Sequence, residues 1–84
     1  MTMEATVRIP VRPRELLEAT LKALEPEASA PPTTRFKVKV WGEGESLIIH
    51  IKAKDTASLR AALNSYLRWV RAIEDAYKAA AGAS

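Results

Sequence analysis

Residues 58–71, SLRAALNSYLRWVR, decide the fold, because they predict a long helix with two faces suited to packing. At 100° per residue, one set of side chains falls in a stripe roughly 80° wide, which suits a face that packs on a core. This set comprises Leu59, Leu63, Tyr66, Val70, Ile73 and Tyr77. A second set, expected nearly opposite, comprises Ala61, Ala62, Ser65, Trp69, Ala72 and Ala76. A domain of this size has no second core, so we expect the second set to dock another protein, with Trp69 as its anchor.

Three alternating segments before this helix predict β-strands. They cover residues 5–11, 35–41 and 47–54, and a short turn at residues 42–45 joins the last two in a hairpin. Pro10 cannot donate a ladder hydrogen bond, so we expect the first strand at an edge of the sheet. The third strand is the most apolar, which favours a central position between the other two.

Two helices complete the predicted order β-α-β-β-α. The first is expected to begin near Pro13 and to end at Pro26. Its predicted buried face comprises Leu16, Leu17, Thr20, Leu21 and Leu24. Asp55 or Thr56 is expected to cap the second helix, whose last residues should fray. The predicted fold is a single α+β domain over residues 1–84, a two-layer sandwich of a three-stranded antiparallel sheet with both helices on one face.

The first strand leaves one edge of this sheet unpaired, and bare edges are either blocked or paired with another chain. We expect it to pair with a second copy across a twofold axis, giving a six-stranded sheet in a homodimer. The residues of this expected dimer edge are Thr6, Val7, Arg8 and Ile9. The rival is the edge of the second strand, but its alternating lysines make that pairing less favourable.

Composition argues against catalysis. The 84 residues contain no cysteine and one histidine, His50, and the formal net charge is +3. There is thus no disulfide or thiolate metal site, and we expect no cofactor, no metal and no catalytic residue, since no nucleophile–base or phosphate-loop pattern is present. No apolar run approaches the length of a bilayer span and the first residues do not resemble a signal peptide, so a cytoplasmic protein without a membrane partner is expected.

The outward face of the predicted sheet is basic and carries aromatic side chains. Its cations are Arg35, Lys37, Lys39, Lys52 and Lys54, joined by Arg8, and they share the face with Trp41 and His50. Cations interleaved with aromatics can follow a phosphate backbone and stack bases. The alternative is an ordinary solvated sheet face, on which lysines provide solubility. Both interpretations remain open from the sequence.

The segment KAKDTASLRAALNSYLRWVRAIEDA resembles the small dimerisation subunit of the KEOPS complex, a family that includes the animal CTAG/LAGE proteins. The resemblance lies in the run S-L-R-A-x-L-N-S-Y-L-R-W, and the first half of the chain is similar in pattern only. By position it covers Ser58, Arg60, Asn64, Ser65, Tyr66, Arg68 and Trp69. KEOPS transfers a threonylcarbamoyl group to the adenosine beside the anticodon of certain tRNAs, and its transferase is a separate ATP-binding subunit.

The resemblance implies a non-catalytic homodimeric scaffold whose helices dock this transferase. The expected docking residues are Ala61, Ser65, Arg68, Trp69, Ala72 and Ala76 of the long helix, with Ala19 and Ala23 of the first. The alternatives are an exposed Ala-rich helix without a partner, and a small RNA-binding module that uses the basic sheet face. A weak, salt-sensitive contact with tRNA is compatible with the scaffold function.

Overall fold

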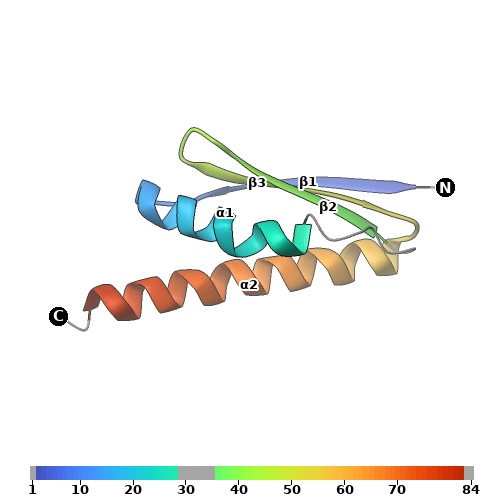
Figure 1. Cartoon of the computed structure of the whole chain (residues 1–84). Coiled ribbons are helices and arrows are strands. Elements are labelled where there is room, and N and C mark those ends of the chain that lie inside the picture. The colour runs from blue at the N-terminus through green and yellow to red at the C-terminus, as the bar shows by residue number, and fades with distance from the viewer. Residues whose placement is uncertain (1, 29–35, 83–84) are drawn as a thin grey trace.

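A computed structural model of the chain describes residues 2–28 and 36–82 (Figure 1). Its three strands are β1 (Met3–Pro10), β2 (Phe36–Glu43) and β3 (Ser46–Ala53). They form one antiparallel sheet in the order β1-β3-β2, so the most apolar strand is central and β1 ends with Pro10 at an edge, as predicted. The α+β class and the β-α-β-β-α order are therefore confirmed.

The hairpin between β2 and β3 is tighter than the sequence indicated. Glu43 pairs with Ser46, so only Gly44 and Glu45 lie outside the ladder. Gly44 has φ 59°, a value that a residue with a Cβ rarely adopts, and Glu45 does not have a positive φ. This combination fits a two-residue type II′ turn, in which glycine comes first.

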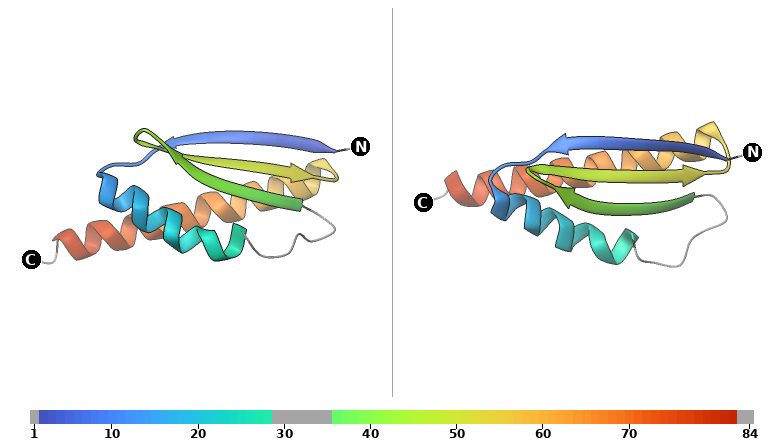
Figure 2. Two further views of the ribbon diagram at one scale, coloured as in Figure 1. Left: turned by 45° about the horizontal axis from the view of Figure 1, so that its top comes forward. Right: turned by 90° about the horizontal axis from the view of Figure 1, so that it is seen from above.

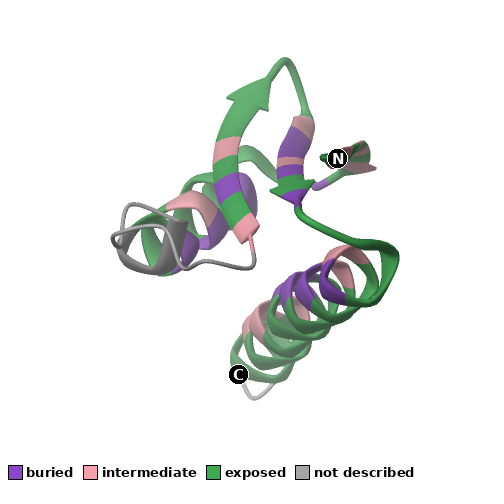
Figure 3. Cartoon of the chain, turned by 90° about the vertical axis from the view of Figure 1, so that its right-hand side faces the viewer, coloured by how far each residue is buried: buried purple, intermediate pink, exposed green. Residues whose placement is uncertain are grey.

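Both helices cover the same face of the sheet (Figures 2 and 3). The first, α1 (Arg14–Ala28), lies against β2, and the second, α2 (Thr56–Gly82), lies against β3 and β1. Asp55 caps α2, because its Oδ1 accepts a hydrogen bond of 2.7 Å from the Ser58 backbone N–H. The cap is thus the first of the two residues considered from the sequence.

The predicted end of α1 was wrong. Pro26 does not stop α1, which continues to Ala28. A proline removes one backbone hydrogen bond, but within the last turn its fixed φ still fits a helix, so the end moves only two residues. The fraying expected for the last residues of the chain stays a prediction, since α2 extends through Gly82 and residues 83–84 lie outside the described residues.

The core lies between the sheet and the two helices. Leu47, Ile49 and Ile51 of β3 form its floor, and each is fully buried. The predicted inner face of α1 is confirmed, with Leu16, Leu17, Thr20 and Leu24 buried and Leu21 packed against them. The predicted inner face of α2 is confirmed as well, since all six residues are buried or packed against the core cluster.

One residue of α2 was assigned to the wrong face. Ala62 was expected on the docking face, yet it is 1% exposed and belongs to the core. It lies in the row of buried residues Ser58, Ala62, Tyr66 and Val70, spaced four apart. An alanine in this row permits a close approach of the helix to the sheet, so its small size reflects intramolecular packing.

Candidate functional site

A hollow of about 360 Å³ lies between α1 and α2 on the surface of the helical layer. It is lined by Ala23 and Leu24 of α1 and by Trp69, Ala72 and Ile73 of α2. The hollow is therefore apolar, and three of the residues expected to dock a partner line it together. The sequence predicted a docking face opposite the core, whereas this hollow lies at the flank of the core beside α1.

Trp69 stands at the border between the core and this hollow. Its side chain is 41% exposed, although its ring lies 5.1 Å from the Tyr66 ring, at an interplanar angle of 58°. A tilted pair of this kind is a favourable aromatic arrangement. The buried tyrosine thus holds the indole in place while much of its surface remains open to a partner.

The other predicted docking residues differ in their placement. Ser65, Arg68 and Ala76 are exposed on α2, and Ala19 is exposed one turn before Ala23 on α1. They can flank the hollow but do not line it. Ala61 lies elsewhere, in a second hollow near the start of α2 with Phe36, Lys54 and Ala57. Leu24 and Ile73 line the first hollow but were not predicted to do so, because both belong to core faces. A groove between two helices is lined by the borders of those faces.

Three of the predicted cations lie on the sheet. Lys37, Lys39 and Lys52 are exposed, and Lys37 lies directly opposite Lys52 in the ladder. Lys54 is also exposed, but it lies beyond the end of β3 and lines the hollow near the start of α2 instead of the sheet face. Lys39 lies opposite His50. Arg35 lies outside the described residues.

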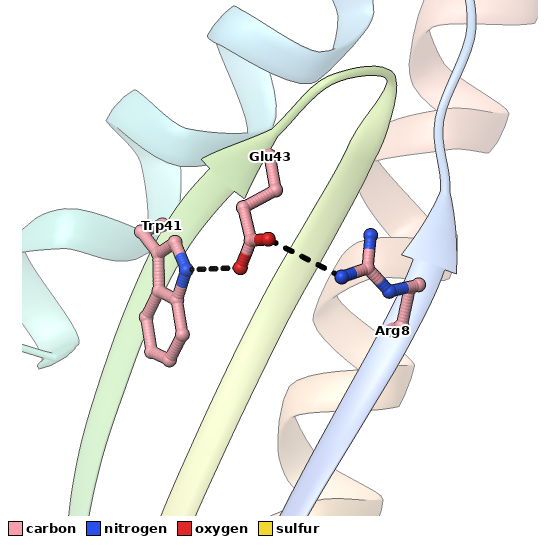
Figure 4. A network of polar contacts seen from close by, with 3 residues as sticks. All are labelled: Arg8, Trp41 and Glu43. Carbon is pink, nitrogen blue, oxygen red and sulfur yellow. Dashed lines mark hydrogen bonds and ion pairs between the residues drawn. The ribbon is translucent and has the colours of Figure 1, made fainter.

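Arg8, which was grouped with these cations, is instead part of a polar network with Glu43 and Trp41 (Figure 4). Arg8 Nη2 lies 3.3 Å from Glu43 Oε1, and Trp41 Nε1 donates a hydrogen bond of 2.9 Å to Glu43 Oε2. In the ladder, Arg8 and Trp41 are the two neighbours of Ile48. Ile48 faces outward between them, but it is only 2% exposed because these side chains surround it.

This network changes the acidity of Glu43. The hydrogen bond from Trp41, together with the hydrogen bond and positive charge of Arg8, lowers the pKa of the Glu43 carboxyl below its ordinary value of 4.5. A lowered pKa in the folded state means that the charged carboxylate stabilises the fold. This stabilisation is present above the ordinary pKa and is lost as the pH falls through the lowered one.

We therefore expect Glu43→Gln to lower the urea midpoint of unfolding near neutral pH, because glutamine keeps the shape but removes the charge. The difference from the unsubstituted chain should shrink as the pH falls from 4.5 through the lowered pKa of Glu43, because the carboxylate of the unsubstituted chain then becomes protonated. Urea titrations over this pH range measure the effect. A difference that stays constant on acidification would contradict a role for the carboxylate charge.

His50 has partners that its sequence neighbours did not reveal. Strand β1 brings Thr6 Oγ1 to 2.8 Å from His50 Nδ1 and Glu4 Oε1 to 3.1 Å from His50 Nε2. A carboxylate only accepts, so Nε2 carries a proton and Nδ1 accepts from the Thr6 hydroxyl when the ring is neutral. These contacts hold the His50 ring against the neighbouring strand β1, which is a structural role. Over the residues that the structure describes, no group of three or more His, Cys, Asp or Glu side chains could hold a metal ion.

The expected dimer edge lies in β1, which borders the sheet on one side as β2 does on the other. Thr6 and Arg8 are exposed on the outer face, whereas Val7 and Ile9 are half-buried beneath the helices. Within the described ranges, neither helix combines the length and the apolar character that crossing a bilayer requires.

The fold and the interhelical hollow thus define a small two-layer α+β domain with an apolar surface site between its helices. The chain belongs to the Pcc1 family, since the family model described as "Transcription factor Pcc1" matches residues 4–78. It is 30% identical over 61 residues to the KEOPS complex subunit Pcc1 of Pyrococcus abyssi (strain GE5 / Orsay), a match that covers 73% of this chain and 74% of the relative. The resemblance found in residues 52–76 is therefore confirmed.

The fold is shared with a solved structure. A chain in the crystal structure of the binary Gon7-Pcc1 complex superposes with a TM-score of 0.79, covering 92% of this chain and 94% of the other. The sequence identity is 19%, so this likeness concerns the fold alone.

Proposed function

We propose that this chain is the non-catalytic scaffold subunit of a KEOPS complex and docks the ATP-binding threonylcarbamoyl transferase subunit through its two helices. Membership of the Pcc1 family and the similarity to an archaeal KEOPS subunit support this role. The observation that carries it is the hollow between α1 and α2, in which Trp69 remains 41% exposed above an apolar floor. Its proposed role in tRNA modification is structural, because it holds the transferase and the transferase performs the chemistry.

The hollow suits a helix of the partner. Its walls carry alanines, Ala23 on α1 and Ala72 on α2, so a third helix can approach closely between them. Burial of an exposed indole in such a contact is a strong source of binding free energy, because aromatic anchors dominate most interfaces. Arg68 and Ser65 are exposed on the same helix and are proposed to form the polar rim.

Fluorescence provides the direct test of this docking mode. In a Trp41→Phe background, Trp69 is the only indole, and its emission should shift to the blue as the transferase subunit is added and water leaves the ring. The Trp69→Phe background, which keeps Trp41 on the opposite face, is the matched control and should show no shift. Saturable binding without a change at Trp69 would place the docking surface elsewhere.

We also propose that two copies pair through β1. The helix α2 lies on the β1 side of the molecule and α1 on the β2 side (Figure 2). Relative to Tyr66, Trp69 lies about 60° toward α1 and Leu67 about 100° toward the opposite flank. Leu67 is 38% exposed there. If two β1 strands pair across a twofold axis, this flank faces its counterpart, and an exposed leucine favours that arrangement over pairing through β2.

Leu67→Arg is accordingly expected to convert the dimer to a monomer, because it places two like charges in the contact between the paired α2 helices. Light scattering measures the mass, and circular dichroism checks that the exposed substitution preserves the fold. A variant that remains dimeric would contradict pairing through β1.

The alternative, a small RNA-binding module, uses the outer face of the sheet. That face lies opposite the helices, so the two functions do not compete for the same surface (Figure 3).

A further inference from the structure

The outer face of the sheet divides into a neutralised part and a cationic part. In the neutralised part, Glu43 bridges Arg8 and Trp41. The cationic part contains Lys37, Lys39 and Lys52, which we call the lysine cluster. Lys37 and Lys52 are direct ladder partners, so their Cβ atoms lie about 4.5–5.5 Å apart. Lys39 is two residues along the same strand and thus about 6.6 Å from Lys37.

The lysine cluster lacks carboxylate partners among the described residues. Cations near the hairpin are paired, Arg8 with Glu43 at 3.3 Å and Arg12 with Glu45 at 2.7 Å. Glu4 is the β1 residue opposite Lys52, but its carboxylate lies on His50 Nε2. Like charges placed directly opposite each other in a ladder destabilise a sheet. The fold therefore keeps a local repulsion that a bound polyanion would relieve.

We propose that the lysine cluster is a contact site for the phosphate backbone of RNA. Three cations within two neighbouring strands form a compact positive surface, and Trp41 continues the row of Lys37 and Lys39 along β2 with its indole 39% exposed. Lysines are compact point charges that bind phosphates without a fixed geometry, so a row of them suits a flexible phosphate backbone. An aromatic side chain at the end of the row adds a surface on which a base stacks.

This site is separate from the interhelical hollow. Both helices lie on the other face of the sheet, so RNA and a docked protein can be bound together (Figures 1 and 3). The choice of RNA over other nucleic acids rests on the proposed role in tRNA modification. Binding is nevertheless measured on the isolated chain, so a negative result here leaves transferase docking unaffected and the two failures are distinguishable.

The test is fluorescence anisotropy with a labelled oligouridylate over a range of salt concentrations. Three phosphate contacts to a single strand give a slope of log affinity against log salt of about −2. The variant Lys37→Gln, Lys39→Gln, Lys52→Gln is expected to lose about tenfold or more in affinity at low salt, with a slope near zero. Its melting temperature should not fall, because the substitutions remove opposed like charges.

The matched control is Lys22→Gln, Arg60→Gln, Arg71→Gln on the helices. All three residues are exposed, and both triple variants lower the net charge from +3 to 0, since each removes three positive charges. The control should keep most of the affinity. Equal loss in both variants, or no binding at low salt, would overturn the site. Displacement of the RNA by polyglutamate of equal charge at equal concentration would overturn the assignment to RNA and indicate an acidic protein.

Discussion

Replacing Trp69 with alanine is expected to weaken binding of the transferase subunit roughly thirtyfold, because an aromatic anchor contributes about 2 kcal/mol or more. The indole is 41% exposed in the hollow between α1 and α2, so a partner covers surface that is otherwise open to water. The fold should survive, since Tyr66 below it remains buried in the core. Isothermal titration with the transferase subunit measures the loss.

Trp41→Ala is the matched control for this prediction. It makes the same substitution at an indole of similar exposed fraction, 39%, but on the outer face of the sheet, away from the hollow. It should leave the affinity for the transferase unchanged. If both variants bind as tightly as the unsubstituted chain, the hollow is not the docking site.

The second large effect is expected from arginine at position 62. Ala62 is 1% exposed within the core, so Ala62→Arg forces a charge and a long side chain between α2 and the sheet. The cost of an unpaired buried charge is several kcal/mol, which is comparable to the total stability of a domain of this size. We expect the variant to be unfolded by circular dichroism at room temperature.

Ala72→Arg is the counterpart on the same helix. Ala72 is exposed and lines the hollow, so this variant should fold normally and lose transferase binding by more than Trp69→Ala does, about a hundredfold or more. The two arginine variants thus separate core packing from docking. A folded Ala62→Arg variant, or an Ala72→Arg variant that docks normally, would contradict the assignment of faces on α2.

The sheet could be predicted well from the sequence, and the reasons are local. Apolar and polar residues alternate with a period of two, which is the period of a strand. The most apolar strand is favoured at the centre of the sheet, and this gives the order β1-β3-β2. The start of α2 was also predicted, with Asp55 or Thr56 as its cap, because a cap depends on one side chain and a backbone N–H three residues away.

Features that depend on the distance between layers could not be predicted. A helical wheel treats alanine as small and neutral, so it could not distinguish Ala62, which lies where α2 approaches the sheet, from Ala72, which faces the hollow. The bridge from Arg8 to Glu43 joins side chains on β1 and β2 across the central strand. It depends on the register of two ladders at once. Leu24 and Ile73 could not be predicted as lining residues of the hollow either, because both belong to the apolar faces that pack on the core.

The most direct measurement of the central claim is size-exclusion chromatography with light scattering on the chain alone and mixed with the ATP-binding transferase subunit. The scaffold function predicts a dimer for the chain alone and a larger species of defined mass for the mixture. Two peaks that elute as they do separately, each with its own mass, would contradict docking and leave the lysine cluster on the opposite face as the remaining candidate for function.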